Sequence, residues 1–222
     1  DCANDANFGR SFYIDINDLF NTIEDIFGVE SDDKVFITTQ KIFFGLMWYG
    51  ISDEEMAVLT QSNFNEIYSA ISIDNHFYEI SREFYNMCMD AFSFVSYITR
   101  SNRKVIRYFQ SGDYLLKGTY ATKETAQQHT EPLVITSALS NKMKAWKKNI
   151  EHLPMNSRSK FKKIDRSGIV RSGIYSEVFF NCKFANRENI QAFIEEHYPH
   201  IKGGVNSNTN NFLAWRKYFY GK

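Results

Sequence analysis

The chain has 222 residues, of which 43% are hydrophobic and 16% aromatic, a composition that suits one globular domain or one domain with an appendage. No apolar run approaches the roughly 18 residues of a membrane span, no signal peptide is visible, and Cys2, Cys88 and Cys182 form no Cys-x-x-Cys pair. The sequence therefore argues against a membrane protein, a disulfide scaffold and a zinc site, and it favours a reducing, cytoplasmic compartment.

The net charge of zero hides a strong asymmetry along the chain. Residues 1–99 hold 17 acidic and 4 basic residues, a balance of −13, whereas residues 100–183 hold 17 basic and 6 acidic residues, a balance of +11. A basic half of this kind indicates a polyanionic partner. The alternative is that the two halves attract each other in the folded protein, since charge runs are often only solvated faces.

The first half of the chain predicts three helices, a hairpin and a further helix. Apolar residues at helical spacing predict helices over residues 14–27, ended by Gly28, and 34–49, ended by Gly50. A shorter helix is predicted over 52–61, where Ser52 and Glu55 have the spacing of a capping box. Residues 68–80 predict a β-hairpin around Asp74 and Asn75, and residues 83–100 predict another buried helix.

The second half predicts mainly helices. A strand or short helix is expected within 102–118, a helical segment after Pro132 and further helices over 166–180 and 189–198, the last ended by Pro199. Residues 206–211 are polar and loop-like, and residues 212–220 form an aromatic and basic tail that favours a short amphipathic helix. The predicted fold class is mainly α with a small antiparallel β-sheet (α+β).

Basic residues interleaved with aromatic ones give the strongest functional signal. They are Lys142, Lys144, Lys147, Lys148, Arg158, Lys160, Lys162, Lys163 and Arg166, with Trp146 and Phe161 between them. Lys144 and Lys148 are four residues apart and share a helix face. Clustered cations with few acids suit the phosphates of double-stranded DNA, and we expect Arg103, Lys104 and Arg171 to contribute as well.

One stretch resembles a segment of tyrosine recombinases and phage integrases. It reads Trp-Tyr-Gly-Ile-Ser-Asp-Glu-Glu-Met-Ala-Val-Leu over residues 48–59, with Gly50, Glu55 and Leu59 in the family's register. The preceding apolar helix and the following hairpin also come in the family's order. The resemblance covers nearly the whole chain. It implies a linker or the remnant of an upstream segment at 1–11, an integrase-like catalytic-domain fold at 12–205 and a C-terminal tail at 206–222 that could serve as an interaction segment.

The same resemblance implies that the strand-cutting chemistry is lost. The family's first arginine falls on Ser52, its histidine on Gly168 and its nucleophilic tyrosine on Phe212, while Arg171 matches the second arginine. The hairpin lysine is missing too, since no Lys occurs from 42 through 99. Phosphoryl transfer needs these cations and a nucleophile, and a Phe forms no phosphotyrosine. Catalytic residues and cofactors are therefore expected to be none, and Arg171 is expected to anchor a DNA phosphate.

The favoured function is a phage or mobile-element DNA-binding regulator, a repressor similar to the integrase-like master repressors of SPβ-type prophages. One alternative is a diverged active recombinase that uses Tyr218 or Tyr220. The other is a protein-interaction module without a DNA role. No metal site is expected, because Pro199 breaks the helix that would align His197 and His200.

The aromatic tail has two interpretations. It packs on its own domain, or it docks on a neighbouring subunit, as this segment often does in the resembled family. In the second case Trp215, Tyr218 and Phe219 would form an oligomer contact.

Overall fold

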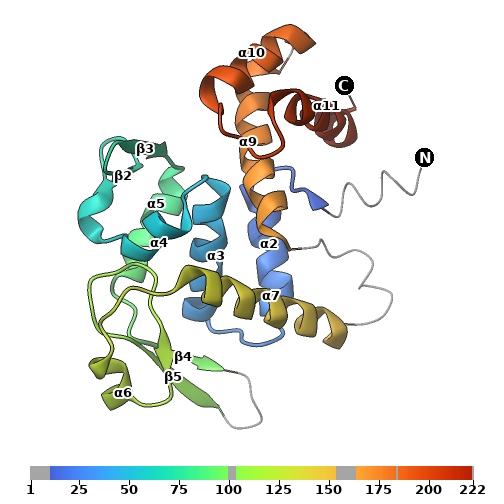
Figure 1. Cartoon of the computed structure of the whole chain (residues 1–222). Helices are drawn as coiled ribbons and strands as arrows, with labels where there is room; N and C mark the ends of the chain where they lie inside the picture. The colour runs from blue at the N-terminus through green and yellow to red at the C-terminus, as the bar shows by residue number, and fades with distance from the viewer. Residues whose placement is uncertain (1–10, 100–103, 154–163, 184, 222) are drawn as a thin grey trace. The chain divides into compact units, whose positions relative to one another are not determined.

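The computed structural model describes residues 11–99, 104–153, 164–183 and 185–221. The chain divides into two compact units: a terminal unit of residues 1–18 and 162–222, and a central unit of residues 19–161. The described residues are mainly helical, with two small antiparallel sheets of three strands each (Figure 1). The α+β class predicted from the sequence is confirmed, with two sheets where one was expected.

The first two predicted helices are present. Helix α2 spans Ile16–Phe27 and ends where the Gly28 N–H donates to the Glu24 carbonyl at 2.8 Å. Helix α3 spans Lys34–Trp48, and the Asp33 side chain accepts a hydrogen bond from the N–H of Val35 at its start. Gly50 then takes a φ of +79°, a left-handed conformation that glycine adopts without the strain of a Cβ. Helix α3 is largely buried, as its long apolar stretch predicted.

Helix α4 is shorter than the sequence suggested. It spans Asp53–Val58 and opens with the predicted capping box between Ser52 and Glu55. Leu59 leaves the helical conformation, with ψ at 123°, and is fully buried. The helix therefore ends before Leu59, whose side chain packs in the core. A 3-10 turn, Gln61–Asn63, follows.

The predicted β-hairpin is confirmed and forms most of the first sheet. Strand β2 (Ala70–Ile73) pairs with β3 (His76–Glu79), with Ile73 opposite His76, and Asp74 takes a positive φ of 49° in the turn. The two-residue strand β1 (Phe64–Asn65) completes the sheet in the order β1-β2-β3.

The helix predicted over residues 83–100 ends early. Helix α5 covers Arg82–Ala91, and the chain then forms strand β4 (Ser96–Thr99), which pairs with β5 (Val105–Phe109) and places Ile98 opposite Ile106. The β-branched and aromatic residues of this stretch fit a pleated strand better than a helix. Strand β6 (Thr119–Tyr120) pairs with β5, and the short helix α6 (Lys123–Gln128), which was not predicted, follows.

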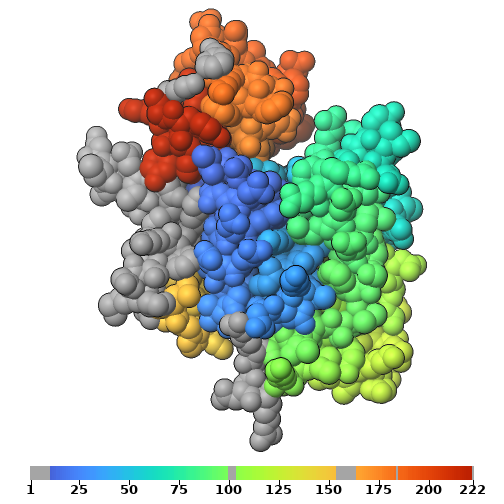
Figure 2. All heavy atoms as spheres, turned by 180° about the vertical axis from the view of Figure 1, so that it is seen from behind, coloured from blue at the N-terminus to red at the C-terminus, as the bar shows by residue number. Residues whose placement is uncertain are grey.

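Helix α7 (Ile135–His152) closes the core of the central unit through Trp146. The indole is 1% exposed and makes edge-to-face contacts with Phe27 and Phe44 at centroid distances of 5.7 and 6.2 Å. The view from behind in Figure 2 shows α5, in green, beside the turquoise hairpin of this unit.

The terminal unit consists of α9 (Arg166–Cys182), α10 (Arg187–His197) and α11 (Val205–Tyr220), with residues 11–15 packed against them. Its core includes Phe12, Tyr175, Ile194, Phe212 and Trp215, and Figure 2 shows red α11 against orange α9 and α10. Residues 206–211, which we expected to be a loop, lie inside α11.

Tertiary contacts explain that difference in the terminal unit. Asn208 and Thr209 are fully buried, and their side chains bond to backbone carbonyls one turn earlier, at Gly204 and Val205. These contacts override the low helix propensity of Asn and Thr.

Candidate nucleic-acid interface

Three predicted DNA-binding lysines form one exposed stripe on α7. Lys144, Lys147 and Lys148 are all exposed, and their i, i+3, i+4 spacing places them on one face of the helix. None of the three pairs with a carboxylate in the part of the chain that the structure describes. Glu151, also exposed, is the one acidic residue on the last two turns of α7. The stripe therefore presents several cations to solvent with little local compensation.

Lys142, the fourth predicted lysine on α7, points the other way. Its ammonium donates to the Gln40 side-chain oxygen and lies 4.9 Å from the centre of the Phe43 ring, inside the central unit. Burial lowers the pKa of Lys142 to about 8, partly offset by the charge of Glu30. A side chain held in this way does not reach a DNA backbone, so we remove Lys142 from the predicted interface.

Of the remaining predicted DNA contacts outside α7 and α9, the structure describes one residue, Lys104. Lys104 is exposed and immediately precedes β5. Five predicted residues lie outside the described residues: Arg103, Arg158, Lys160, Lys162 and Lys163.

In the terminal unit, helix α9 carries the two predicted arginines. Arg166 is the first residue of α9 and Arg171 is five residues further on, so the helix places them on different faces. Both side chains are partly buried. The guanidinium of Arg171 donates to the Lys202 carbonyl at 3.3 Å.

A buried network fixes the turn that Arg171 contacts. The Tyr175 hydroxyl donates to the Asn208 side chain at 3.1 Å, and the Asn208 amide donates to the carbonyls of Lys202 and Gly204 at 3.1 and 2.8 Å. Burial raises the pKa of Tyr175 to about 12, so the hydroxyl remains a donor at neutral pH. The turn and α9 are thereby held in one geometry.

The same turn opens α11. Gly203 and Gly204 take φ values of +97° and +76°, and Gly204 is the N-cap without a side chain to bond the first helical N–H groups. Helix N-termini attract anions through these N–H groups and the helix dipole. The guanidinium of Arg171 and the exposed Lys202 add charge at this end. The arrangement is chemically suited to a phosphate.

Sequence reasoning missed Lys202 and this helix start. The Gly-Gly pair directly before residues 205–220 was the available signal, but the polar run 206–211 hid the helix. The prediction of Arg171 as a phosphate contact was made from the family register alone.

The three positions that the resemblance aligned with catalytic residues all have structural roles. Ser52 caps α4, accepting from the Glu55 N–H at 3.3 Å while its own N–H donates to the Glu55 carboxylate at 2.9 Å. Gly168 lies where α9 packs on residue 11, and an added Cβ would collide with the Ser11 carbonyl. Phe212 is fully buried, with its ring centre 6.0 Å from that of Tyr175.

The tail residues divide between the core and the surface. Trp215 is fully buried, and its indole N–H donates to the Tyr13 carbonyl at 3.0 Å. Phe219 packs against the same core, whereas Tyr218 is 44% exposed. Trp215 is therefore corrected from an oligomer anchor to a core residue, and Tyr218 is the member of the predicted trio that a partner could reach.

Neither a metal centre nor a membrane span is found among the described residues. No group of three or more His, Cys, Asp or Glu side chains in them could hold a metal ion. No helix there is both long enough and apolar enough to cross a bilayer. His197 instead stacks on Phe193, with ring centres 4.1 Å apart.

Comparison with known proteins adds no family: no family model matches the sequence, and no curated protein matches it.

Proposed function

We propose that this chain is a cytoplasmic, sequence-specific DNA-binding regulator on a tyrosine-recombinase-like fold without recombinase activity, in the manner of a phage or mobile-element repressor. The observation that carries the proposal is the exposed stripe of Lys144, Lys147 and Lys148 on α7, unpaired with carboxylates among the described residues. Lysines in such a row neutralise successive backbone phosphates and release their counterions. The surplus of +11 over residues 100–183 supports the same partner.

A second contact is proposed in the terminal unit. Arg171, Lys202 and the N-terminus of α11 together offer a guanidinium, an ammonium and helical N–H groups to one phosphate. Phosphate contacts of this kind position a protein on DNA, while base contacts supply sequence specificity. We assign no base-reading residue.

The absence of catalysis is part of the proposal. With Ser52, Gly168 and Phe212 at the family's catalytic positions and no hairpin lysine, the first arginine, the lysine, the histidine and the nucleophile are replaced together, while Arg171 keeps the second arginine. Loss of one electrostatic element typically costs roughly 10²–10³ in rate, and the losses here fall on several elements at once. The full burial of Phe212 further supports a structural role for this position.

The test is a salt titration of binding to a fluorescein-labelled duplex, read by anisotropy with the full chain. We expect log K to fall with log salt by about 0.9 for each phosphate neutralised. Changing Lys144, Lys147 and Lys148 together to Gln should reduce the slope by about 2 to 3. A flat salt response, or no binding at low salt, contradicts the proposal.

A matched control separates the stripe from net charge alone. Lys34, Lys123 and Lys217 are also exposed and lie on α3, α6 and α11. Their combined change to Gln removes the same charge and should leave the slope close to that of the unchanged protein. Equal losses in the two triple variants would show that α7 is not a specific contact surface. Selection of bound genomic fragments then identifies the operator.

A further inference from the structure

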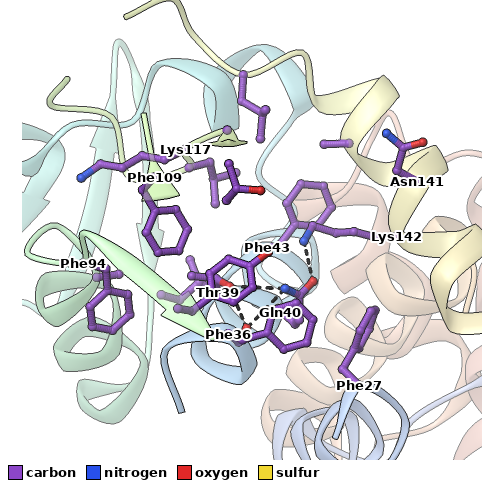
Figure 3. Close-up of a pocket in the computed structure, with 18 of the residues that line it drawn as sticks. Phe27, Phe36, Thr39, Gln40, Phe43, Phe94, Phe109, Lys117, Asn141 and Lys142 are labelled. Atoms are coloured by element: carbon purple, nitrogen blue, oxygen red, sulfur yellow. Dashed lines mark hydrogen bonds between the residues drawn. The ribbon is translucent and has the colours of Figure 1, made fainter. Parts of the chain in front are cut away.

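The central unit contains a cavity of about 400 Å³ between α3, α7 and the second sheet (Figure 3). Its wall is mostly apolar and includes several aromatic rings, among them Phe27, Phe36, Phe43, Tyr97 and Phe109. This volume lies within the roughly 300–1,000 Å³ range of small-molecule sites, which combine an apolar lining with a few placed polar groups.

Lys142 is one of two lysines in the described wall of this cavity. Figure 3 shows its side chain extending from α7 toward α3, with the ammonium directed at Gln40 beside the Phe43 ring. The Gln40 amide is itself held by the Phe36 carbonyl at 3.3 Å, so its oxygen faces the lysine. An ammonium has three N–H donors, and the described residues supply one hydrogen-bond acceptor, Gln40.

Gln40 is the hydrogen-bond partner of this ammonium, and no carboxylate among the described residues pairs with it. Glu30 also lines the cavity and favours the charged form of Lys142, but no described carboxylate lies within ion-pair distance of it. Lys117, the other lysine of the wall, is directed elsewhere in Figure 3 and donates to the Phe92 carbonyl at 3.1 Å. The cavity therefore offers one available cation in an aromatic surrounding.

We propose that this cavity binds a small organic monoanion with an apolar body, a carboxylate on an aromatic or medium-chain aliphatic skeleton. The carboxylate accepts from the Lys142 ammonium, and the apolar body packs against Phe36, Phe43 and Phe109. A single negative charge fits the site, because the Lys142 ammonium faces the cavity and the described part of its lining contains no arginine. The inference is independent of DNA binding.

The charge preference is tested with a matched pair of probes, 4-phenylbutyrate and 4-phenylbutanol, which differ in the carboxylate. The full chain labelled with ¹⁵N is titrated with each, and amide shifts are followed in α3 and α7. We expect a Kd for the acid of about 1 mM or tighter, and binding of the alcohol at least about tenfold weaker. Octanoate tests the aliphatic alternative. Failure of both carboxylates to shift these amides overturns the proposal, as does equal affinity for acid and alcohol.

Two variants locate the site. Lys142→Met should remove the preference for the acid over the alcohol, whereas Lys144→Met, two residues along the same helix, should keep it. Ala138→Leu leaves the lysine in place but fills part of the cavity, so both probes should weaken. If the amide spectrum of Lys142→Met shows that this variant is unfolded, the binding data for Ala138→Leu test the location of the site. Acid binding that survives unchanged in Ala138→Leu, or an acid preference retained in a folded Lys142→Met variant, places the anion elsewhere and overturns the assignment.

Discussion

The indole N–H of Trp215 donates to the backbone carbonyl of Tyr13 at 3.0 Å, across a sequence separation of 202 residues. Tyr13 is held from the other side as well, because its own N–H donates to the Ser172 hydroxyl at 2.9 Å. The residues just before α2 are thus bonded to α9 and α11. The C-terminal tail is part of the core of the terminal unit, and its removal would take Phe212 and Trp215 from that core.

Trp215→Phe should destabilise the protein by about 1–3 kcal/mol, because the buried Tyr13 carbonyl loses this donor. The lost ring volume adds to the effect. The measurement is chemical denaturation followed by tryptophan fluorescence and circular dichroism. Tyr218→Ala serves as the control, since this side chain is 44% exposed and should change stability by about 0.5 kcal/mol. Equal stability of Trp215→Phe and the unchanged protein would contradict the assigned role of the bond.

Self-association through the tail is a hypothesis that now depends on Tyr218. Tyr218→Ser should leave the fold intact and reduce assembly on operator DNA, because an exposed tyrosine is a frequent interface anchor. Analytical ultracentrifugation with and without DNA measures it. Deleting residues 211–222 is unsuitable for this purpose, since it removes core side chains. Unchanged assembly of the Tyr218 variant would remove the tail from consideration as a contact.

Arg171→Ala should weaken DNA binding by roughly 1.5–3 kcal/mol, the value of one charge-assisted contact. Arg187→Ala is a matched control in the same unit. Its guanidinium bonds to Asn210 at 2.6 Å, and we assign it no phosphate. Anisotropy at fixed salt gives both affinities, and thermal melting checks the fold. A similar loss in both variants would point to general charge and not to the α11 start.

Ser52→Arg should restore no strand cleavage and should lower stability by about 1 kcal/mol. Under the proposed recombinase-like ancestry, the substitution would return one of several replaced catalytic groups, and it removes the cap that bonds the Glu55 N–H. Glu55 also accepts from the Tyr78 hydroxyl at 2.9 Å, so the helix start retains partial support. A nicked suicide duplex is the assay. Covalent protein–DNA product from Ser52→Arg or from the unchanged chain would revive the active-recombinase alternative.

Local sequence signals predicted the elements that local interactions dominate. Ser52 and Glu55 form the capping box, Gly50 ends α3, and Asp74 lies in the hairpin turn, each as the spacing indicated. These features depend on residues close together in the chain. The start of α11 was predicted wrongly, because the burial of Asn208 depends on Tyr175, which is 33 residues away in the chain. Strand β4 was not predicted, because its strand conformation depends on pairing with β5, which local sequence signals do not show.

The candidate sites show the same division. Helical spacing correctly put Lys144 and Lys148 on one face of α7. It also puts Lys142 one turn before the buried Trp146, which was an available sign that Lys142 faces inward. The cavity itself lay beyond sequence reasoning, because α3, α7 and the second sheet that form it are distant in the chain.

Lys142→Met should stabilise the protein at neutral pH by about 1–3 kcal/mol, because folding lowers the pKa of this lysine from 10.5 to about 8. Below pH 8 the lysine is charged in both the folded and unfolded states, so the full desolvation penalty opposes folding. Between pH 8 and 10.5 the unfolded chain binds more protons than the folded one, and the stability of the unchanged protein therefore rises with pH. The advantage of Lys142→Met should shrink over that interval. Urea unfolding at pH 7, 8.5 and 10 measures it, with Lys144→Met, on the exposed side of the same helix, as the control that should show no such trend. A stability difference between Lys142→Met and the unchanged protein that stays constant from pH 7 to 10 would mean that Lys142 titrates normally in the folded state.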